Sequence, residues 1–187
     1  STLTQSLSVP IIVAQHMPEL FTRSLTTRLG NICSCGAKLA EKGVLLNAPC
    51  IYIAQGGKHL KPTRVAGSKL VARLIDEHPD ATYKPSVDLL FEAAAEFFGS
   101  RLLAIQLTGM GEDGSRGAKA IRKVGGTVIA QEASSCVVYG MPKAVIESGS
   151  ASAILTPSQI RGVLSTFCTN TATQEPQSGQ SHPRMSA

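Results

Sequence analysis

The stretch from residue 101 to residue 131, RLLAIQLTGMGEDGSRGAKAIRKVGGTVIAQ, decides the fold class. An apolar run, a glycine-rich segment, a helical pattern and a second β-branched run follow one another in it: Arg101–Leu107, Thr108–Gly114, Ser115–Lys123 and Gly126–Gln131. Apolar runs of this length that are separated by a helix predict parallel strands, buried on both faces of a sheet. The stretch therefore predicts a βαβ unit.

The alternation of strands and helices continues on both sides of this unit. Further strands are predicted at Pro10–Ala14, Val44–Asn47, Cys50–Ala54, Lys69–Leu74 (antiparallel) and Ala151–Leu155. Further helices are predicted at Glu19–Leu29, Ser86–Phe98 (with Ser86 as its N-cap), Pro142–Ser148 and Pro157–Phe167. The expected fold class is α/β: a doubly wound, mostly parallel sheet with helices on both faces and a small antiparallel hairpin.

The composition excludes several classes of function. The chain has 18 Lys and Arg against 13 Asp and Glu, a net charge of +5, but the basic residues are scattered rather than clustered. With no Trp, three Tyr and five Phe, it lacks aromatic side chains for stacking bases, so we expect no nucleic-acid partner. A mild positive surface suits an acidic protein partner equally well. No apolar run is long enough to cross a bilayer, so we expect no membrane insertion.

Five cysteines without a visible secretory signal predict reduced thiols and a cytoplasmic location. Cys33 and Cys35 form a C-x-C pair, which differs from the C-x-x-C spacing of zinc sites. Together with Cys50 and His59 they could in principle hold zinc, although incidental cysteines are the interpretation we favour. The sequence thus predicts no disulfide framework, no metal site and no cofactor.

Two polar segments follow predicted parallel strands directly and bring candidate catalytic residues with them. His16 follows the strand Pro10–Ala14, and Asp113 follows the strand Arg101–Leu107. Ligands of open α/β sheets bind at the carboxyl ends of the strands, where these two side chains can meet. A carboxylate that accepts a ring N–H fixes the tautomer of a histidine and stabilises its protonated form. We predict that His16 and Asp113 lie within hydrogen-bonding reach.

The glycines around Met110 allow another interpretation. Residues 109–114, GMGEDG, match G-x-G-x-x-G after a strand and before a helix, the context of a dinucleotide-binding loop. Asp113 lies inside this loop and would repel a diphosphate. We therefore favour a loop that presents a carboxylate, with nucleotide binding as the weaker alternative.

Four segments in order carry a resemblance to a known family: residues 15–18 (QHMP), 84–91 (KPSVDLLF), 107–114 (LTGMGEDG) and 136–142 (CVVYGMP). Together they resemble the catalytic domain of the chemotaxis protein-glutamate methylesterases, the CheB type. Residues 52–60 (YIAQGGKHL) also fit, with Gln55 where proline is usual. Lys84 stands where the family usually has arginine, so a bidentate contact to a carboxylate would be lost there.

The resemblance implies a serine esterase without a metal or organic cofactor. His16 would be the general base and later the general acid, Asp113 would orient it, and Met110 and Lys84 would contact the substrate. The substrates would be glutamyl methyl esters on the cytoplasmic helices of chemoreceptors, with glutamine deamidation as a side activity. Members of this family commonly carry a regulatory receiver domain in the same polypeptide; here such a domain would lie upstream, or the chain would belong to a stand-alone esterase.

The sequence departs from the family in one respect. The family's nucleophile is a serine in a Gly-x-Ser-x-Gly-Gly turn, and no such serine precedes His16. Residues 1–7 would be the end of the helix that follows this turn. We expect residues 1–167 to form an N-terminally incomplete catalytic domain, inactive alone and with a gap in its sheet, and residues 168–187 to be a disordered tail or linker. The alternative is a catalytically inactive module of the same fold that binds a receptor or another partner.

Overall fold

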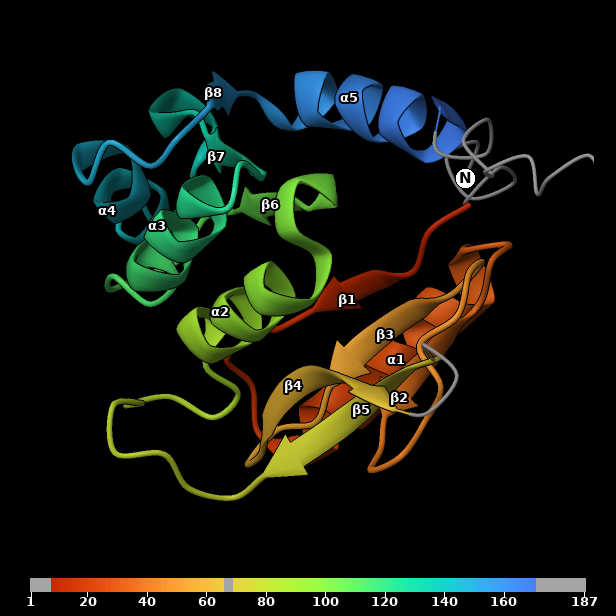
Figure 1. The fold of residues 1–187 in the computed structure, drawn as a ribbon. Helices are drawn as coiled ribbons and strands as arrows, with labels where there is room; N and C mark the ends of the chain where they lie inside the picture. The colour runs from red at the N-terminus through yellow and green to blue at the C-terminus, as the bar shows by residue number, and fades with distance from the viewer. Residues whose placement is uncertain (1–7, 66–68, 171–187) are drawn as a thin grey trace, which may run out of the picture.

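The computed structural model describes residues 8–65 and 69–170 (Figure 1). Its strands are β1 (Ile11–Val13), β2 (Ala37–Ala40), β3 (Ile51–Ala54), β4 (His59–Val65), β5 (Lys69–Ile75), β6 (Leu103–Gln106), β7 (Thr127–Gln131) and β8 (Ala153–Leu155). Its α-helices are α1 (Glu19–Ile32), α2 (Val87–Phe98), α3 (Ser115–Lys123), α4 (Met141–Glu147) and α5 (Pro157–Asn170). Short 3₁₀ turns lie at Gly99–Arg101 and Ala133–Ser135.

The parallel strands form two three-stranded sheets, in the orders β1-β3-β2 and β6-β7-β8. Within residues 8–65 and 69–170, β1 and β6 pair only with β3 and β7, so each leaves one edge unpaired. β1 and β6 are the strands of the two sheets that face each other across the junction (Figure 1). The α/β prediction is confirmed. The parallel strands fall into two sheets, as expected for a sheet with a gap.

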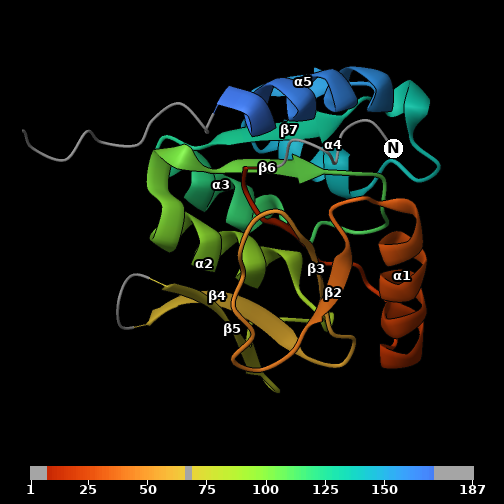
Figure 2. The same cartoon turned by 90° about the vertical axis from the view of Figure 1, so that its right-hand side faces the viewer.

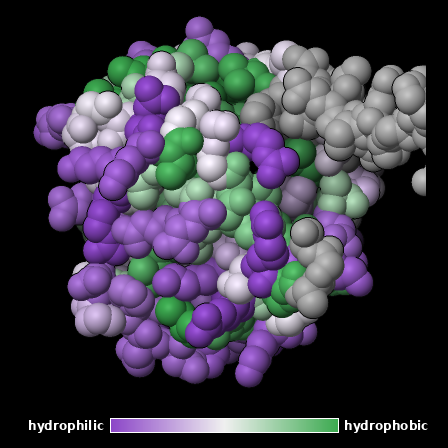
Figure 3. Space-filling view, in the orientation of Figure 1, coloured by the Kyte–Doolittle hydropathy of each residue, from purple (hydrophilic) through white to green (hydrophobic). Residues whose placement is uncertain are grey.

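The interruption explains why the first strand is less buried than its sequence predicted. All three residues of β1 are half-buried, whereas all four residues of β3, which pairs on both sides, are buried. In β6 the pattern alternates between half-buried and buried positions. Apolar surface is visible in the middle of this face of the molecule, bordered by hydrophilic side chains (Figure 3).

The antiparallel hairpin is present, and the sequence predicted the second of its two strands. Strand β5 pairs with β4, from His59↔Ile75 to Val65↔Lys69. The predicted strand Val44–Asn47 is reduced to one antiparallel bridge with β5, Leu45↔Val71, with backbone hydrogen bonds between Val44 and Ala72 and between Leu46 and Leu70. Ala48 and Pro49 turn the chain directly afterwards. Strands β2 and β4 were not predicted.

The helices cover the sheets in the predicted manner and fix the orientation of the site. Helix α2 packs against α3 and β4, while α1 packs against β2 and β3 from the other side (Figure 2). Two buried apolar clusters result: one spans β3, β4 and β5 under α2, and the other joins α3 to β6 and β7. All five predicted helices are present. Helix α5 extends to Asn170, three residues beyond the predicted boundary of the domain at residue 167. The predicted helical end at residues 1–7 and most of the predicted tail lie outside the described residues.

Candidate active site

His16 and Asp113 lie together where the two parallel sheets meet. His16 comes three residues after the end of β1, and Asp113 follows β6 in the loop that leads into α3. His16 Nε2 lies 2.7 Å from Asp113 Oδ2, although 97 residues separate the two in the sequence. Side-chain exposure is 21% for His16 and 9% for Asp113, so the carboxylate is sequestered while the imidazole keeps contact with solvent. The structure thus brings together the two residues that strand-end reasoning selected.

The carboxylate of Asp113 is held by four hydrogen bonds. Oδ2 accepts from the backbone N–H of Val87 and from Nε2 of His16, both at 2.7 Å. Oδ1 accepts from the Ser86 hydroxyl and from the backbone N–H of Asp88, both at 2.9 Å. The backbone donors belong to the first turn of α2, where N–H groups have no partner inside the helix and favour a negative charge. Asp113 is therefore fixed by the N-terminus of a helix to which it does not belong.

These donors keep the carboxylate ionised. Burial alone would raise the pKa of Asp113. The hydrogen bonds from His16, from the backbone of Asp88 and Val87 and from Ser86 outweigh burial and hold this pKa below its usual value. An ionised Oδ2 accepts and cannot donate, so neutral His16 carries its proton on Nε2 and leaves Nδ1 free as the basic nitrogen.

Tyr83 covers one face of the His16 ring. The two ring centroids are 4.5 Å apart and the planes differ by 19°, which is a stacked arrangement. Stacking of this kind restricts the imidazole to rotation within its own plane and adds to the hydrogen bond with Asp113 in fixing its orientation. The sequence offered no signal for this contact, because Tyr83 is an ordinary loop residue until the fold places it on the histidine.

Ser86 links a buried histidine to the site. Its side chain accepts from the Leu89 N–H, which confirms the predicted N-cap of α2. Its backbone N–H donates to Nδ1 of His59, a fully buried side chain whose Nε2 has no partner among the described residues. Burial, followed by the charge of Lys84, lowers the pKa of His59, so this ring stays neutral as an acceptor for Ser86. His59 thus supports the loop that carries Ser86.

Two glycines let the catalytic loops approach closely. A Cβ on Gly56 would lie 2.3 Å from the carbonyl oxygen of Met17, so only glycine lets this loop pack against the segment after His16. Gly114 has φ +104°, and a Cβ there would lie 2.2 Å from Gln106 Oε1. The glycines of the resembling segments therefore have a steric role on both sides of the His16–Asp113 pair.

Met110 and Lys84 lie on the loops around the site. Met110 is 75% exposed, on the loop that follows β6. The backbone N–H of Gly109 in this loop donates to the carbonyl oxygen of Val138 at 3.0 Å, which ties the loop to the one before α4. The side chain of Lys84 forms an ion pair with Glu77, which is largely exposed. Their predicted contacts with a substrate remain predictions.

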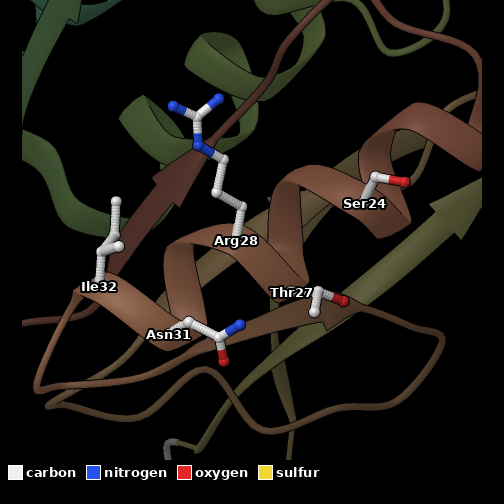
Figure 4. A pocket seen from close by; sticks show the side chains of 5 residues that line it. All are labelled: Ser24, Thr27, Arg28, Asn31 and Ile32. Atoms are coloured by element: carbon white, nitrogen blue, oxygen red, sulfur yellow. The ribbon is translucent and has the colours of Figure 1, made fainter.

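Two hollows mark the surface. One of about 480 Å³ opens beside Asp113 and is lined by residues of the loops before α2 and before α3 and of both helices, including Tyr83, Asp88 and Arg116. The other, of about 560 Å³, is lined by five residues of α1 alone: Ser24, Thr27, Arg28, Asn31 and Ile32 (Figure 4). The hollow on α1 has only one charged group, Arg28, and no polar group from another element. We therefore place the candidate active site at Asp113 and not on α1.

The N-terminus of α3 is already occupied by a side chain. Oδ1 of Asp88 accepts from the N–H of Gly114 at 2.9 Å and from the N–H of Gly117 at 2.8 Å. A phosphate would need these donors. The geometry therefore argues against the dinucleotide interpretation of residues 109–114. Among the described residues, no group of three or more His, Cys, Asp or Glu side chains could hold a metal ion, so the zinc alternative finds no support.

Comparison with known proteins decides the family. The family model described as CheB methylesterase matches residues 1–164. The chain belongs to the CheB methylesterase family. The Thermotoga maritima CheB methylesterase catalytic domain superposes with a TM-score of 0.82 and 39% identity, covering 87% of this chain and 85% of that one. This confirms the fold and the family that the four segments indicated.

Curated relatives in the CheB family carry the name protein-glutamate methylesterase/protein-glutamine glutaminase. The protein from Saccharophagus degradans is 43% identical over 158 residues, which are 84% of this chain and 42% of that protein. The protein from Vibrio cholerae is 43% identical over 140 residues, 75% of this chain and 37% of that protein. The chain thus spans about two fifths of the length of these relatives. In the described part of the chain, no helix is both long and apolar enough to span a membrane.

Proposed function

We propose that this chain provides the general base and its orienting carboxylate to a methylesterase that hydrolyses glutamyl methyl esters on chemoreceptor helices. The observation that carries the proposal is the 2.7 Å contact between His16 Nε2 and Asp113 Oδ2. Membership of the CheB methylesterase family and the names of its curated relatives support the reaction class. Deamidation of glutamine at the same positions is the expected side activity, because an amide passes through the same tetrahedral intermediate. The proposed location is the cytoplasm.

The proposed mechanism moves one proton through Nδ1 of His16. As the oxygen of a serine hydroxyl forms a bond to the ester carbonyl carbon, Nδ1 of His16 takes the hydroxyl proton, and the negative charge moves to the carbonyl oxygen. Collapse of this intermediate breaks the bond to the methoxy group, which receives the proton from His16 and leaves as methanol. Water then hydrolyses the acyl-serine with the same base and releases glutamate. Asp113 stays ionised and stabilises the imidazolium in both steps.

We propose that the serine lies in a segment outside the residues described here. The 187 residues contain no Gly-x-Ser-x-Gly-Gly turn. The unpaired edges of β1 and β6 offer a place for one further parallel strand, which would bring such a turn to the carboxyl ends of both sheets. Intact mass and N-terminal sequencing of the native gene product test this part: a glycine-flanked serine ahead of Ser1 supports it, and a mature chain that begins at Ser1 contradicts it.

Methanol release from methyl-labelled chemoreceptor membranes tests the reaction. We expect saturable release by the native gene product, a loss of about a thousandfold or more in kcat in His16→Ala, and negligible release by the 187-residue chain alone. If the native product carries the serine turn and binds the receptor but releases no methanol, the alternative of an inactive binding module replaces the esterase.

A further inference from the structure

The carboxylate of Asp88 and that of Asp113 cap each other's helices. Asp113, in the loop before α3, accepts the backbone N–H groups of Val87 and Asp88 at the start of α2. Asp88, in the first turn of α2, accepts the backbone N–H groups of Gly114 and Gly117 at the start of α3. Four hydrogen bonds between 2.7 and 2.9 Å thus join the two helix N-termini through two side chains.

We propose that Asp88 is a positioning residue that holds Asp113 in register with His16. The proposal rests on the proposed function only for its effect on turnover, because the geometry of His16 and Asp113 can be measured without a substrate. It assigns a role to a residue of the segment 84–91 that the sequence analysis did not count among the site residues.

The contact with Gly114 is what couples Asp88 to the catalytic carboxylate. The N–H of Gly114 belongs to the peptide bond whose carbonyl carbon comes from Asp113, so Oδ1 of Asp88 holds the backbone of Asp113 directly. The second bond, to Gly117, ties the same oxygen to the first turn of α3 and prevents the loop from rotating against the helix. Without these bonds the Asp113 side chain would keep its partners in α2 but lose the anchor of its own backbone.

The surroundings of Asp88 suit a hydrogen-bond acceptor that is not itself reactive. Its side chain is 16% exposed, and Arg116 Nε lies 4.0 Å from Oδ2 while bonding Glu92 at 2.6 Å. Burial, and to a lesser extent the charge of Asp113, raises the pKa of Asp88, whereas Gly117, Arg116 and Gly114 lower it. Asp113 bonds the His16 ring, whereas the described hydrogen bonds of Asp88 go to the backbone of Gly114 and Gly117.

A capping role alone and a positioning role predict different results. If Asp88 only stabilises α3, its removal lowers the free energy of unfolding and leaves His16 unchanged in the folded protein. If it positions Asp113, its removal also weakens the contact between Asp113 and Nε2, and neutral His16 then divides between its two tautomers. The supporting groups of a catalytic pair act through such sub-ångström placement.

The test compares Asp88→Ala and Asp88→Asn with Glu92→Ala as the matched control. Glu92 lies one turn further along α2 and shares Arg116, but it makes no bond to the backbone around Asp113. Imidazole nitrogen NMR of the 187-residue chain at neutral pH reads the tautomer of His16. We expect Nε2–H in the unmodified chain and in Glu92→Ala, a mixture in Asp88→Ala, and a smaller shift in Asp88→Asn, whose amide oxygen still accepts both N–H groups.

The second measurement is the rate of methanol release by the native gene product. Asp88→Ala is expected to lower kcat by about 10- to 100-fold with little change in KM, and Asp88→Asn to recover most of it. An unchanged His16 spectrum in folded Asp88→Ala overturns the proposal; should this variant fail to fold, an unchanged spectrum in Asp88→Leu, whose larger side chain also accepts no hydrogen bond, does so. If the tautomer shifts while the native product proves inactive, the positioning role stands and the proposed function fails.

Discussion

The loop before α3 and the first turn of α2 each contribute one aspartate that binds the N-terminus of the other helix. The pKa values of these two carboxyl groups are nevertheless shifted in opposite directions. Asp113 is the more buried, with 9% side-chain exposure against 16% for Asp88. Its pKa is nevertheless lowered, whereas that of Asp88 is raised. Asp113 accepts hydrogen bonds from four groups through both of its oxygens, and these donors include a hydroxyl and an imidazole. Asp88 accepts two backbone hydrogen bonds, both through Oδ1. The additional donors outweigh burial at Asp113, and they favour the ionised form of the carboxylate that faces His16.

Replacing the better-bonded carboxylate should have the largest effect. Asp113→Asn puts an NH₂ group among four donors and removes the charge that fixes the tautomer of His16. In the native gene product we expect kcat for methanol release to fall by about 10³- to 10⁴-fold, as for other triads that lose this charge. Glu147→Gln, which removes an exposed carboxylate from α4, is the control and should leave kcat unchanged. Turnover within tenfold (about one order of magnitude) of the unmodified enzyme would contradict the role of Asp113.

The constraint on the loop that joins Asp113 to α3 is tested by Gly114→Ala. A Cβ at residue 114 would lie 2.2 Å from Gln106 Oε1, so the buried Gln106 side chain or the loop has to move, and φ +104° strains any residue other than glycine. We expect the free energy of unfolding in urea to fall by about 1–3 kcal/mol. Gly162→Ala is the matched control: a Cβ there meets nothing within 4 Å, and in a helix we expect a gain of up to about 1 kcal/mol. Equal effects at the two positions would show that the loop before α3 is not tightly constrained.

Removing the stacked ring separates orientation by Asp113 from orientation by Tyr83. Tyr83→Ala leaves the hydrogen bonds of Asp113 in place and exposes one face of the imidazole. A stacked pair contributes about 0.5–1.5 kcal/mol, so we expect kcat to fall by about two- to tenfold. Tyr83→Phe keeps the ring and should retain turnover. A loss in Tyr83→Phe as large as in Tyr83→Ala would assign the effect to the hydroxyl group instead.

The opposite pKa shifts of Asp113 and Asp88 should appear in the pH dependence of the free energy of unfolding. We expect this effect to be the smallest of the four. Because the pKa of Asp113 is lowered on folding, its contribution to stability is present above about pH 4 and is lost as the pH falls through the folded value. The raised pKa of Asp88 means that stability decreases as the pH rises from about 4 through the folded value. Urea unfolding between pH 3 and 7 (roughly the range that spans both windows) measures both. Asp113→Asn should abolish the first slope and Asp88→Asn the second, and slopes that survive these substitutions would assign them to other groups.

The sequence predicted the C-terminal sheet better than the N-terminal one, for physical reasons. Strands β6 and β7 are continuous apolar runs that a helix must separate, so their pattern has one interpretation. Strand β2, AKLA, contains a single large apolar residue, and β4 contains Pro62, which normally argues against a strand. Pro62 is tolerated because β4 pairs only with β5 and has a free edge.

The contact between His16 and Asp113 was predictable because the carboxyl ends of parallel strands meet, whatever their distance in the sequence. The groups that hold the pair were not. Tyr83, Asp88 and His59 act through contacts that appear only when α2 packs on α3 and the hairpin closes beneath α2. The sequence did signal the start of α2 at Ser86, but not that the free N–H groups of its first turn would bind a carboxylate from another loop.

We propose that the first turn of α2 holds Asp113 ionised against Nε2 of His16, which leaves Nδ1 to act as the base. Imidazole nitrogen NMR of the unmodified chain at neutral pH is the first measurement to make. We expect one neutral tautomer for His16, with the proton on Nε2, and loss of this preference in Asp113→Asn. A His16 ring that carries its proton on Nδ1, or a tautomer that Asp113→Asn leaves unchanged, would contradict it.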